Sequence, residues 1–293
     1  MSSQFPVHNV KFCSPSQIAR SYKIIAVDMD GTLLNDKRLV PEYNKDMIYK
    51  AIELGVKFVI CSGRPPMALK FYSEELFPKE PMICCNGAVI IGENKSIIKS
   101  NPLNRYSLLR VIDLLREEKD TYYHFYDDFG LYSEQFRYTT KKFYDNNNDS
   151  NSKFKMKITI VKNSKTFIKH SKCSISKIVV IDEDVEYLNR LRGKIDKVPG
   201  ITTTKSDLYN IEIVSRGVSK GKALEFLAGY YKVPMGECIA IGNDENDKSM
   251  ISAAGLGVAV RNSREILKKS ADYITDIDNN SGAVGEVIKK FIL

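Results

Sequence analysis

The stretch Asp28-Met29-Asp30-Gly31-Thr32-Leu33 directly follows the apolar run Ile24-Ile25-Ala26-Val27, and this junction decides the fold. The apolar run predicts a buried strand, and the glycine turn predicts where that strand ends. Two carboxylates at such an end are suited to phosphoryl transfer to water. Asp28 would attack phosphorus as a covalent nucleophile, and Asp30 would protonate the leaving alcohol and then deprotonate the attacking water. A bare Asp-x-Asp is more often a surface turn with its own side-chain hydrogen bonds, but the preceding apolar run favours the chemical interpretation.

The composition is that of an ordinary globular protein. The chain has 293 residues, 43% of them hydrophobic and 27% charged, which is enough for one large domain or two medium ones. No apolar run approaches the roughly 18 residues of a membrane span. Residues 1–20 lack the apolar centre of a secretory signal, and we interpret them as a flexible N-terminal extension. These features favour a cytoplasmic protein.

The net charge of +8 is concentrated in residues 88–208, where 22 Lys and Arg face 16 Asp and Glu. A basic surface can attract nucleic acid, an anionic membrane or a phosphorylated substrate. The lysines of this segment are dispersed, so we favour a solvated surface and expect no nucleic-acid partner. The cysteines show no metal-ligand spacing, and we interpret them as reduced core thiols. They are Cys13, Cys61, Cys84, Cys85, Cys173 and Cys238.

Strand and helix signals alternate at both ends of the chain. In the first part, strands are expected at 23–27, 57–61 and 81–85, and helices at 41–54 and 66–76. This β-α-β-α-β order predicts a parallel sheet that is covered on both faces and has right-handed crossovers. In the last part, helices are expected at 220–231, 244–253, 263–269 and 284–292, and strands at 237–241, 256–260 and 272–275.

A mixed α+β segment interrupts this pattern. It has an expected hairpin at 88–99, helices at 104–119 and 183–195, and strands at 122–126, 155–161, 177–181 and 201–205, followed by a strand at 209–214. Residues 146–153 are polar and of low complexity, and we interpret them as a loop. We therefore predict an α/β protein. A doubly wound, Rossmann-like core domain would comprise residues 21–87 and 209–293, and an inserted α+β domain residues 88–208.

Further polar groups follow other predicted strands, and ligands bind at the carboxyl ends of the strands in such sheets. In Ser62-Gly63-Arg64, a small hydroxyl beside glycine can donate to a phosphate oxygen, although an ordinary helix N-cap is as plausible. Lys220 and Lys222 lie at a predicted helix start, where an ammonium can bridge a carboxylate and a phosphate, although most lysines lie on the surface.

The stretch Gly242-Asn243-Asp244-Glu245-Asn246-Asp247 follows another predicted strand. Its carboxylate and amide oxygens are the hard ligands that Mg²⁺ prefers. The alternative is an acidic helix N-terminus that the helix dipole stabilises.

Taken in order, these motifs resemble those of the haloacid dehalogenase (HAD) superfamily, in its Cof-type subfamily IIB, across residues 22–293. The family's first motif is DxDGT, and its second is a Ser or Thr, often in TGR. Its third, KGxAL, matches residues 220–224 and selects Lys220 over Lys222. Its fourth, GDxxND, matches at Gly242, Asn246 and Asp247. Cys85-Asn86-Gly87-Ala88 is similar to the NGA turn at which the chain enters its cap, and the large insert is similar to a cap of type C2 B.

The resemblance implies a Mg²⁺-dependent phosphatase that forms an aspartyl-phosphate and acts on small phosphorylated metabolites, sugar phosphates above all. It implies that the catalytic residues are Asp28, Asp30, Ser62 and Lys220. It implies phosphate or substrate contacts from Gly31, Thr32, Gly63, Arg64, Asn86 and Asn246. It implies metal ligands at Asp28, Asp30 through its backbone carbonyl, Asn243 and Asp247. Aromatic candidates for the specificity of the insert are Tyr122, Tyr123, His124, Tyr126 and Tyr209.

Asn243 departs from the family pattern, which has Asp at this position. An amide oxygen can coordinate a metal but brings one charge fewer, so we expect weak Mg²⁺ binding, with Asp244 as the other candidate ligand. A non-catalytic sugar-phosphate-binding regulator therefore stays open. A phosphomutase also stays open, although the fourth motif of those enzymes is longer and Gly-rich. The expected partner is a small phosphorylated substrate, with no membrane partner, and the expected assembly is a monomer or weak homodimer.

Overall fold

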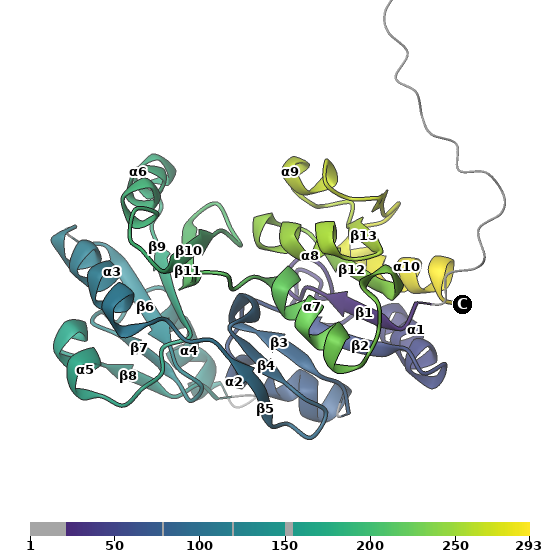
Figure 1. The fold of residues 1–293 in the computed structure, drawn as a ribbon, viewed down its shortest axis with the longest axis horizontal. Helices are drawn as coiled ribbons and strands as arrows, with labels where there is room; N and C mark the ends of the chain where they lie inside the picture. Colours follow the sequence, from purple (N-terminus) through teal and green to yellow (C-terminus); the bar gives the residue numbers. More distant parts are fainter. Residues whose placement is uncertain (1–21, 78, 119, 150–154) are drawn as a thin grey trace, which may run out of the picture.

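The structure, a computed structural model, describes residues 22–77, 79–118, 120–149 and 155–293 (Figure 1). The predicted N-terminal extension, residues 1–20, lies outside the described residues. Residues 150–153 of the predicted polar loop also lie outside them. Figure 1 shows two parts, a core on the right and a second part on the left, which the chain enters and leaves once.

An eight-stranded sheet forms the core. Its strands, in spatial order, are β14 (Tyr273–Ile274), β13 (Leu256–Ala259), β12 (Cys238–Gly242), β1 (Ile24–Val27), β2 (Lys57–Cys61), β3 (Met82–Cys84), β4 (Val89–Ile91) and β5 (Ile97–Ser100). The strands from β14 to β3 are parallel, and β4 and β5 are antiparallel additions at one edge. The parallel sheet predicted from the strand and helix alternation is confirmed.

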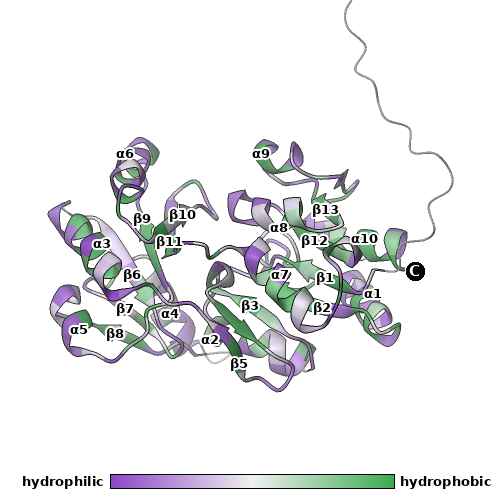
Figure 2. Cartoon of the chain, in the orientation of Figure 1, coloured by the Kyte–Doolittle hydropathy of each residue, from purple (hydrophilic) through white to green (hydrophobic). Residues whose placement is uncertain are grey.

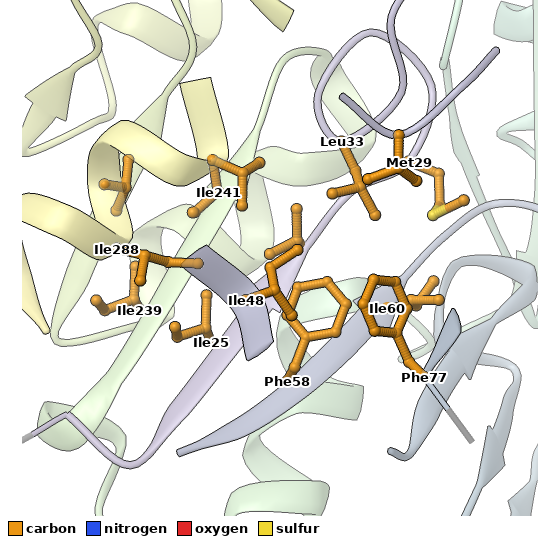
Figure 3. Packing of buried hydrophobic residues seen from close by; sticks show 14 of the residues in the cluster. Ile25, Met29, Leu33, Ile48, Phe58, Ile60, Phe77, Ile239, Ile241 and Ile288 are labelled. Atoms are coloured by element: carbon orange, nitrogen blue, oxygen red, sulfur yellow. The ribbon is translucent and has the colours of Figure 1, made fainter. Parts of the chain in front are cut away.

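Helices cover both faces of this sheet because successive residues of each strand point to opposite sides. In β1, Ile25 packs in one hydrophobic cluster and Ala26 in the other. Helices α1 (Glu42–Glu53) and α10 (Ala283–Phe291) supply the first cluster, in which Ile48 and Ile288 flank the strands (Figure 3). Helices α7 (Lys220–Tyr230) and α8 (Lys248–Ala253) supply the second. Figure 2 shows the core strands as predominantly hydrophobic.

Short helical segments connect the remaining core strands. They are α2 (Pro66–Phe71), which continues as a π-helix at Tyr72–Leu76, α9 (Glu265–Lys268), and 3₁₀ turns at Cys85–Gly87, Met235–Glu237, Glu245–Asp247 and Asn279–Ser281. The predicted helix at 244–253 is thus a 3₁₀ turn followed by α8.

The second part, which we call the cap, is built on a six-stranded sheet. Its strands, in spatial order, are β10 (Ile201–Thr204), β11 (Asn210–Ser215), β9 (Lys177–Ile181), β6 (Tyr122–Tyr126), β7 (Leu131–Ser133) and β8 (Ile158–Ile160). Its helices are α3 (Arg105–Glu117), α4 (Thr139–Asn148), α5 (Ser164–His170) and α6 (Val185–Ile195). Apolar residues of α3, α5 and α6 pack on one face of the sheet. The other face, which carries His124, Lys177 and Glu212, lines a cleft toward the core.

The pairing of the strands places the boundaries between core and cap at other positions than the predicted limits of 88 and 208. The hairpin β4–β5, which was assigned to the insert, extends the core sheet because β4 pairs with β3. Strand β11, which was assigned to the core, pairs with β9 and β10 in the cap sheet. We therefore propose that the cap begins after Ser100 and ends before Lys220.

Three cap elements were not predicted, namely β7, α4 and α5. Helix α4 includes Asn146, Asn147 and Asn148, which were interpreted as loop because the segment is polar and of low complexity, and asparagine also disfavours helix interiors. Tertiary contacts override that propensity here, since the Asn147 side chain bonds both backbone groups of Met156 at 2.7 and 2.8 Å. Among the described residues, no helix is long and apolar enough to cross a membrane.

Candidate active site

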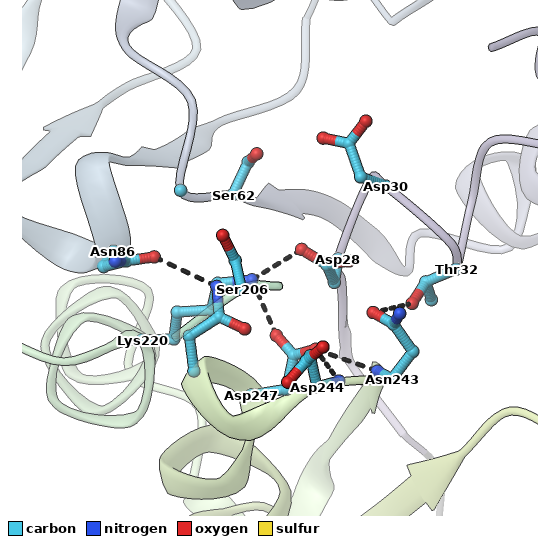
Figure 4. A network of polar contacts seen from close by, with 12 residues as sticks. Asp28, Asp30, Thr32, Ser62, Asn86, Ser206, Lys220, Asn243, Asp244 and Asp247 are labelled. Carbon is cyan, nitrogen blue, oxygen red and sulfur yellow. Dashed lines mark hydrogen bonds and ion pairs between the residues drawn. The ribbon is translucent and has the colours of Figure 1, made fainter. Parts of the chain in front are cut away.

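The carboxyl ends of four neighbouring strands, β12, β1, β2 and β3, meet at one edge of the core sheet. Asp28 follows β1, Ser62 follows β2, and Asn243 follows β12, so residues far apart in the sequence lie together (Figure 4). Asp28, Ser62 and Asn243 thus lie at the carboxyl ends of strands, as expected from the sequence. Lys220 reaches the same place from the first turn of α7.

The Lys220 ammonium bridges two carboxylates at the centre of this site. Its Nζ lies 2.6 Å from Asp28 Oδ1 and 2.6 Å from Asp247 Oδ1, and its side chain is 0% exposed. Burial alone would lower the pKa of Lys220, but the two carboxylates raise it above its ordinary value. Lys222 is 66% exposed and pairs with Glu225 at 2.7 Å. Of the two lysines, Lys220 is the one that lies between Asp28 and Asp247.

The same environment acts on Asp28. Burial and the nearby charge of Asp247 raise the pKa of Asp28 to about 7, against the opposing influence of Lys220. A carboxyl group with such a pKa lies close to the balance between its protonated and ionised forms at neutral pH. Perturbed ionisable groups in a cleft are typical of functional sites.

Close packing of two helices fixes the position of Lys220. Ser219 caps α7 by accepting a hydrogen bond from the Lys222 amide at 3.2 Å. A Cβ at Gly221 would lie 2.3 Å from the Ser249 carbonyl oxygen of α8, so only glycine permits this approach. The motif glycine therefore serves to bring the lysine to the sheet edge.

Asp247 is held by the turn that follows β12. Its Oδ2 accepts hydrogen bonds from the backbone amides of Asn243, at 2.8 Å, and Asp244, at 3.1 Å. Asp244 forms the other half of a capping box, and its Oδ1 also faces Arg264 at 3.3 Å. Both oxygens of Asp247 thus have protein partners, and Asp244 serves as a helix cap.

Asp30 pairs with Arg64, which the sequence analysis assigned to phosphate. The guanidinium forms two bonds to the carboxylate, from Nε to Oδ2 at 2.8 Å and from the terminal nitrogen to Oδ1 at 2.5 Å. Burial raises the pKa of Asp30, but Arg64, with Arg38 and Lys142, outweighs it and lowers the net value. In this state Asp30 is ionised, while Arg64 lines the cleft.

Ser62 and its neighbours form a tight loop at the end of β2. The Ser62 hydroxyl accepts from the backbone amide of Arg64 at 3.1 Å, two residues on, which is a local turn. The N-cap of α2 is Pro65, so Ser62 does not act as the helix cap considered above. A Cβ at Gly63 would lie 2.9 Å from Asn86 Oδ1, so any other residue here would displace the Asn86 side chain.

Asn86 connects the core to the cap. It adopts a left-handed backbone with φ of 57°, and its amide donates to Glu212 Oε2 at 2.7 Å. Its oxygen accepts from Asn246 Nδ2 at 3.3 Å. Glu212 in turn pairs with Lys177 at 2.7 Å, with side chains only 5% and 3% exposed. Lys177 also donates to the Gly63 carbonyl.

Sequence reasoning missed Lys177 and Glu212. Both lie on cap strands, where strand alternation places them on the cleft face with His124. Lys177 was counted among the dispersed surface lysines of the insert. The available signal was a single charge inside each of two apolar strand stretches, which disfavours a solvated position.

A cleft of about 920 Å³ joins these groups between core and cap. Among the aromatic candidates, His124 and Tyr126 line it, and their Nε2 and hydroxyl oxygen lie 2.9 Å apart. Tyr123 faces the opposite side of the sheet, in the cap's hydrophobic cluster. Tyr122 is buried and accepts from the Thr140 amide at 3.0 Å, and Tyr209 is exposed.

A metal site here would use mixed oxygen donors. Among the described residues, no group of three or more His, Cys, Asp or Glu side chains is arranged to hold a metal ion. Asp28 Oδ2, the Asp30 carbonyl and Thr32 Oγ1 nevertheless converge on one terminal atom of the Asn243 amide, at 3.2, 3.1 and 3.2 Å. Carboxylate and carbonyl oxygens that face a common point suit a hard cation. The residues present therefore fit Mg²⁺ at this place.

Comparison with known proteins identifies the family. The profile of the haloacid dehalogenase-like hydrolases matches residues 25–288. The chain belongs to this family. The predicted HAD membership, in its Cof-type branch, is confirmed, and the HAD-like chain is a phosphatase.

Curated relatives cover nearly the whole HAD-like chain. It is 28% identical to the phosphatase YwpJ of Bacillus subtilis over 287 residues, which cover 92% of the chain and 100% of the relative. It is 29% identical to YcsE of the same organism, a 5-amino-6-(5-phospho-D-ribitylamino)uracil phosphatase, over 271 residues, which cover 92% and 96%.

Solved structures agree on the fold. A haloacid dehalogenase-like hydrolase from B. subtilis superposes with a TM-score of 0.81 at 26% identity, covering 91% of this chain and 99% of the other. A sugar phosphatase of HAD subclass IIB superposes with a TM-score of 0.77 at 18% identity, covering 92% and 100%. The predicted Rossmann-like core with an inserted cap is thus confirmed.

Proposed function

We propose that this HAD phosphatase hydrolyses small phosphate monoesters with Mg²⁺, through an aspartyl-phosphate on Asp28. The observation that carries the proposal is the buried Lys220 ammonium between Asp28 and Asp247, at 2.6 Å from each. A buried nucleophile with a fixed cation beside it can receive a phosphoryl group without reorganisation. The assignments of catalytic, phosphate-binding and metal-binding residues form part of this proposal.

The reaction uses the chain's own carboxylates in two steps. Asp28 attacks phosphorus with a carboxylate oxygen, the bond to the leaving alcohol breaks, and Asp30 gives that alcohol its proton. Asp30 then takes a proton from water, which attacks phosphorus and releases phosphate and Asp28. Lys220 and the Ser62 loop stabilise the phosphoryl oxygens. Asp28, the Asp30 carbonyl and Asn243, with Asp247 close by, would hold Mg²⁺, and the ion would supply positive charge that polarises the phosphoryl group.

Arg64 has two partners in this scheme. It holds the Asp30 carboxylate in a bidentate pair, and it lines the cleft where the substrate phosphate enters. A phosphate binds a guanidinium in the same bidentate way as a carboxylate, so the two compete for it. Substrate phosphate would therefore draw Arg64 from Asp30 and leave Asp30 able to take up the proton that it later donates.

The size of the cleft supports the proposed substrate class. A cleft of about 920 Å³ between core and cap accommodates a small metabolite, and the cap would exclude bulk water from it. We propose phosphorylated sugars and sugar-like polyols, and the relative that acts on a ribitylamino-uracil phosphate supports inclusion of such compounds. The proposed enzyme acts in the cytoplasm as a monomer or weak homodimer. We propose no nucleic-acid partner and no membrane partner for it.

Asp28→Asn tests the mechanism. The change replaces one carboxylate oxygen by an amide, so the fold should persist while phosphate release falls by several orders of magnitude. The measurement is phosphate release from p-nitrophenyl phosphate and from a panel of sugar phosphates with Mg²⁺. Retention of more than a few per cent of the activity by the folded variant would exclude the aspartyl-phosphate route.

The same assays separate the competing functions. A non-catalytic regulator would bind sugar phosphates without turnover, and a phosphomutase would transfer the phosphoryl group to a hexose phosphate rather than to water. Release of free phosphate by the native chain supports the phosphatase.

A further inference from the structure

The Asn243 side chain occupies the point at which the proposed metal ligands converge. In the ionised form of Asp28, its Oδ2 and the Asp30 carbonyl oxygen are both acceptors without a hydrogen. An amide oxygen directed at them would be repelled by both and could accept only from the Thr32 hydroxyl, at 3.2 Å. With the amide turned so that its nitrogen takes that position, the nitrogen donates to both, at 3.2 and 3.1 Å, and contacts Thr32 Oγ1 at 3.2 Å. Figure 4 shows Asn243 beside Thr32 and below Asp28.

These contacts complete the hydrogen bonding of the nucleophile. Asp28 Oδ1 faces the Lys220 ammonium, and Asp28 Oδ2 faces the Asn243 amide. Both oxygens are therefore held by donors from the protein. An aspartate at 243 has no hydrogen to offer, and it would place a third carboxylate beside Asp28 and Asp247. Like charges at this distance in a buried site repel strongly.

Asparagine differs from aspartate here because its two ends have opposite roles. The NH₂ end can replace a cation as a donor to Asp28 and the Asp30 carbonyl. The oxygen end can ligate a cation once the amide has rotated by half a turn about its terminal bond. Rotation removes the two hydrogen bonds, so it opposes metal binding.

We propose that Asn243 is an internal substitute for the metal: its NH₂ group holds Asp28 and the Asp30 carbonyl in position in the metal-free protein, and its amide turns over when a cation binds. This inference rests on the proposed function in that it assumes a Mg²⁺ site at these ligands. The metal-free chain keeps its nucleophile aligned, at the cost of weaker metal binding.

Thermal unfolding in EDTA tests the first half of the proposal. Loss of hydrogen bonds to a buried carboxylate should lower the unfolding midpoint of Asn243→Ala by about 2–4 °C. The unfolding midpoint of Asn243→Asp should fall at least as far, because the new carboxylate also repels Asp28 and Asp247. Asn94→Asp is the matched control, since Asn94 lies exposed in the β4–β5 turn and its side-chain oxygen accepts hydrogen bonds from Ser96. The unfolding midpoint of Asn94→Asp should equal that of the native protein.

Titration with Mg²⁺, monitored by the same midpoint and by Mn²⁺ binding in electron paramagnetic resonance, tests the second half. Asn243→Asp should bind the cation about tenfold more tightly than the native chain and show the larger rise in midpoint. The side-chain NH₂ signal of Asn243 in a spectrum of ¹⁵N-asparagine-labelled native protein, assigned by its loss in Asn243→Asp, should shift when Mg²⁺ is added.

Two results would overturn the inference. One is an Asn243→Ala midpoint in EDTA equal to that of the native protein, which would show that the amide holds nothing in the metal-free state. The other is an NH₂ signal that does not move while Mg²⁺ binds, which would show that the amide does not turn. Failure of the proposed function looks different, because then Mg²⁺ would shift neither variant nor native protein and no phosphate would be released.

Discussion

Lys220 is the residue on which the buried charges of the site depend. Lys220→Met leaves Asp28 and Asp247 facing each other without a cation, and breaking such a buried pair typically costs about 3–5 kcal/mol of unfolding free energy. We expect a loss of this size in urea unfolding, together with loss of phosphate release. Lys222→Met, two residues on and exposed, should change the free energy by less than about 0.5 kcal/mol.

The stability of Lys220→Met should partly recover when Asp247→Asn is added, because one of the two unpaired charges is then removed. A double variant no more stable than Lys220→Met would show that the lysine stabilises by packing rather than by charge.

His124 makes stability depend on pH. Burial, and secondarily the Lys177 charge, lowers the pKa of His124 to about 3 in the folded protein, whereas an unfolded histidine titrates near about 6.5. Below the unfolded pKa the unfolded chain binds a proton that the folded chain does not. The unfolding free energy should therefore fall by about 1.4 kcal/mol for each pH unit below about 6.5, and the loss should be absent above it.

His124→Gln, which cannot titrate, should remove this contribution. The measurement is urea unfolding of both proteins at pH 7 and pH 5.5, where the difference between them should change by about 1.4 kcal/mol. Parallel pH dependences for the native protein and the variant would mean that His124 accepts its proton without unfolding.

At the scale of an element, α7 carries two glycines that should respond oppositely to alanine. A Cβ at Gly221 would meet the Ser249 carbonyl oxygen at 2.3 Å, whereas a Cβ at Gly229 has nothing within 4 Å. Gly221→Ala should therefore push α7 away from α8, cost about 1–3 kcal/mol, and lower the turnover rate by displacing Lys220. Gly229→Ala should stabilise by about 0.4–1 kcal/mol without changing turnover. Chemical unfolding and phosphate release measure both, and a common sign for the two variants would contradict this account.

The strands that position the site were predictable, because each is a short apolar run and a polar residue of the site directly follows it. Asp28, Ser62 and Asn243 could be placed together from strand order alone, since parallel strands end at one edge. The cap was less predictable. Helix α4 contains asparagines that disfavour a helix, and β11 was assigned to the core although it pairs with cap strands. The pairing of Arg64 with Asp30 also required the three-dimensional structure.

At the scale of the whole molecule, two ion pairs connect the cap to the catalytic edge. Lys177 and Glu212 are buried and bond to Gly63 and Asn86, whereas Arg192 and Glu245 are 25% and 27% exposed. Glu212→Gln removes a charge and leaves the Lys177 ammonium buried. We expect kcat to fall at least tenfold, because the loop at Gly63 and the cap then lose their common anchor.

Glu245→Gln is the matched control for Glu212→Gln, since it removes the same charge from the less buried pair. Its effect on kcat should stay within about fivefold, because a pair in contact with solvent contributes only about 0.2–1 kcal/mol. Steady-state kinetics on a sugar phosphate measures both variants. Equal losses would indicate that burial of the Lys177 pair has no special importance for alignment of the cap.

The order of the core strands also has a consequence for how the protein is made. The central strand β1 pairs with β12, so Ile24 has no partner on that side until the ribosome has synthesised Cys238. At about 5–20 residues per second, this delay is on the order of 10–40 s. The cap lies wholly inside that interval and has its own hydrophobic cluster. Vectorial synthesis therefore allows the cap to fold first on the nascent chain, while the backbone groups on one edge of β1 stay unpaired and its apolar side chains stay available to chaperones.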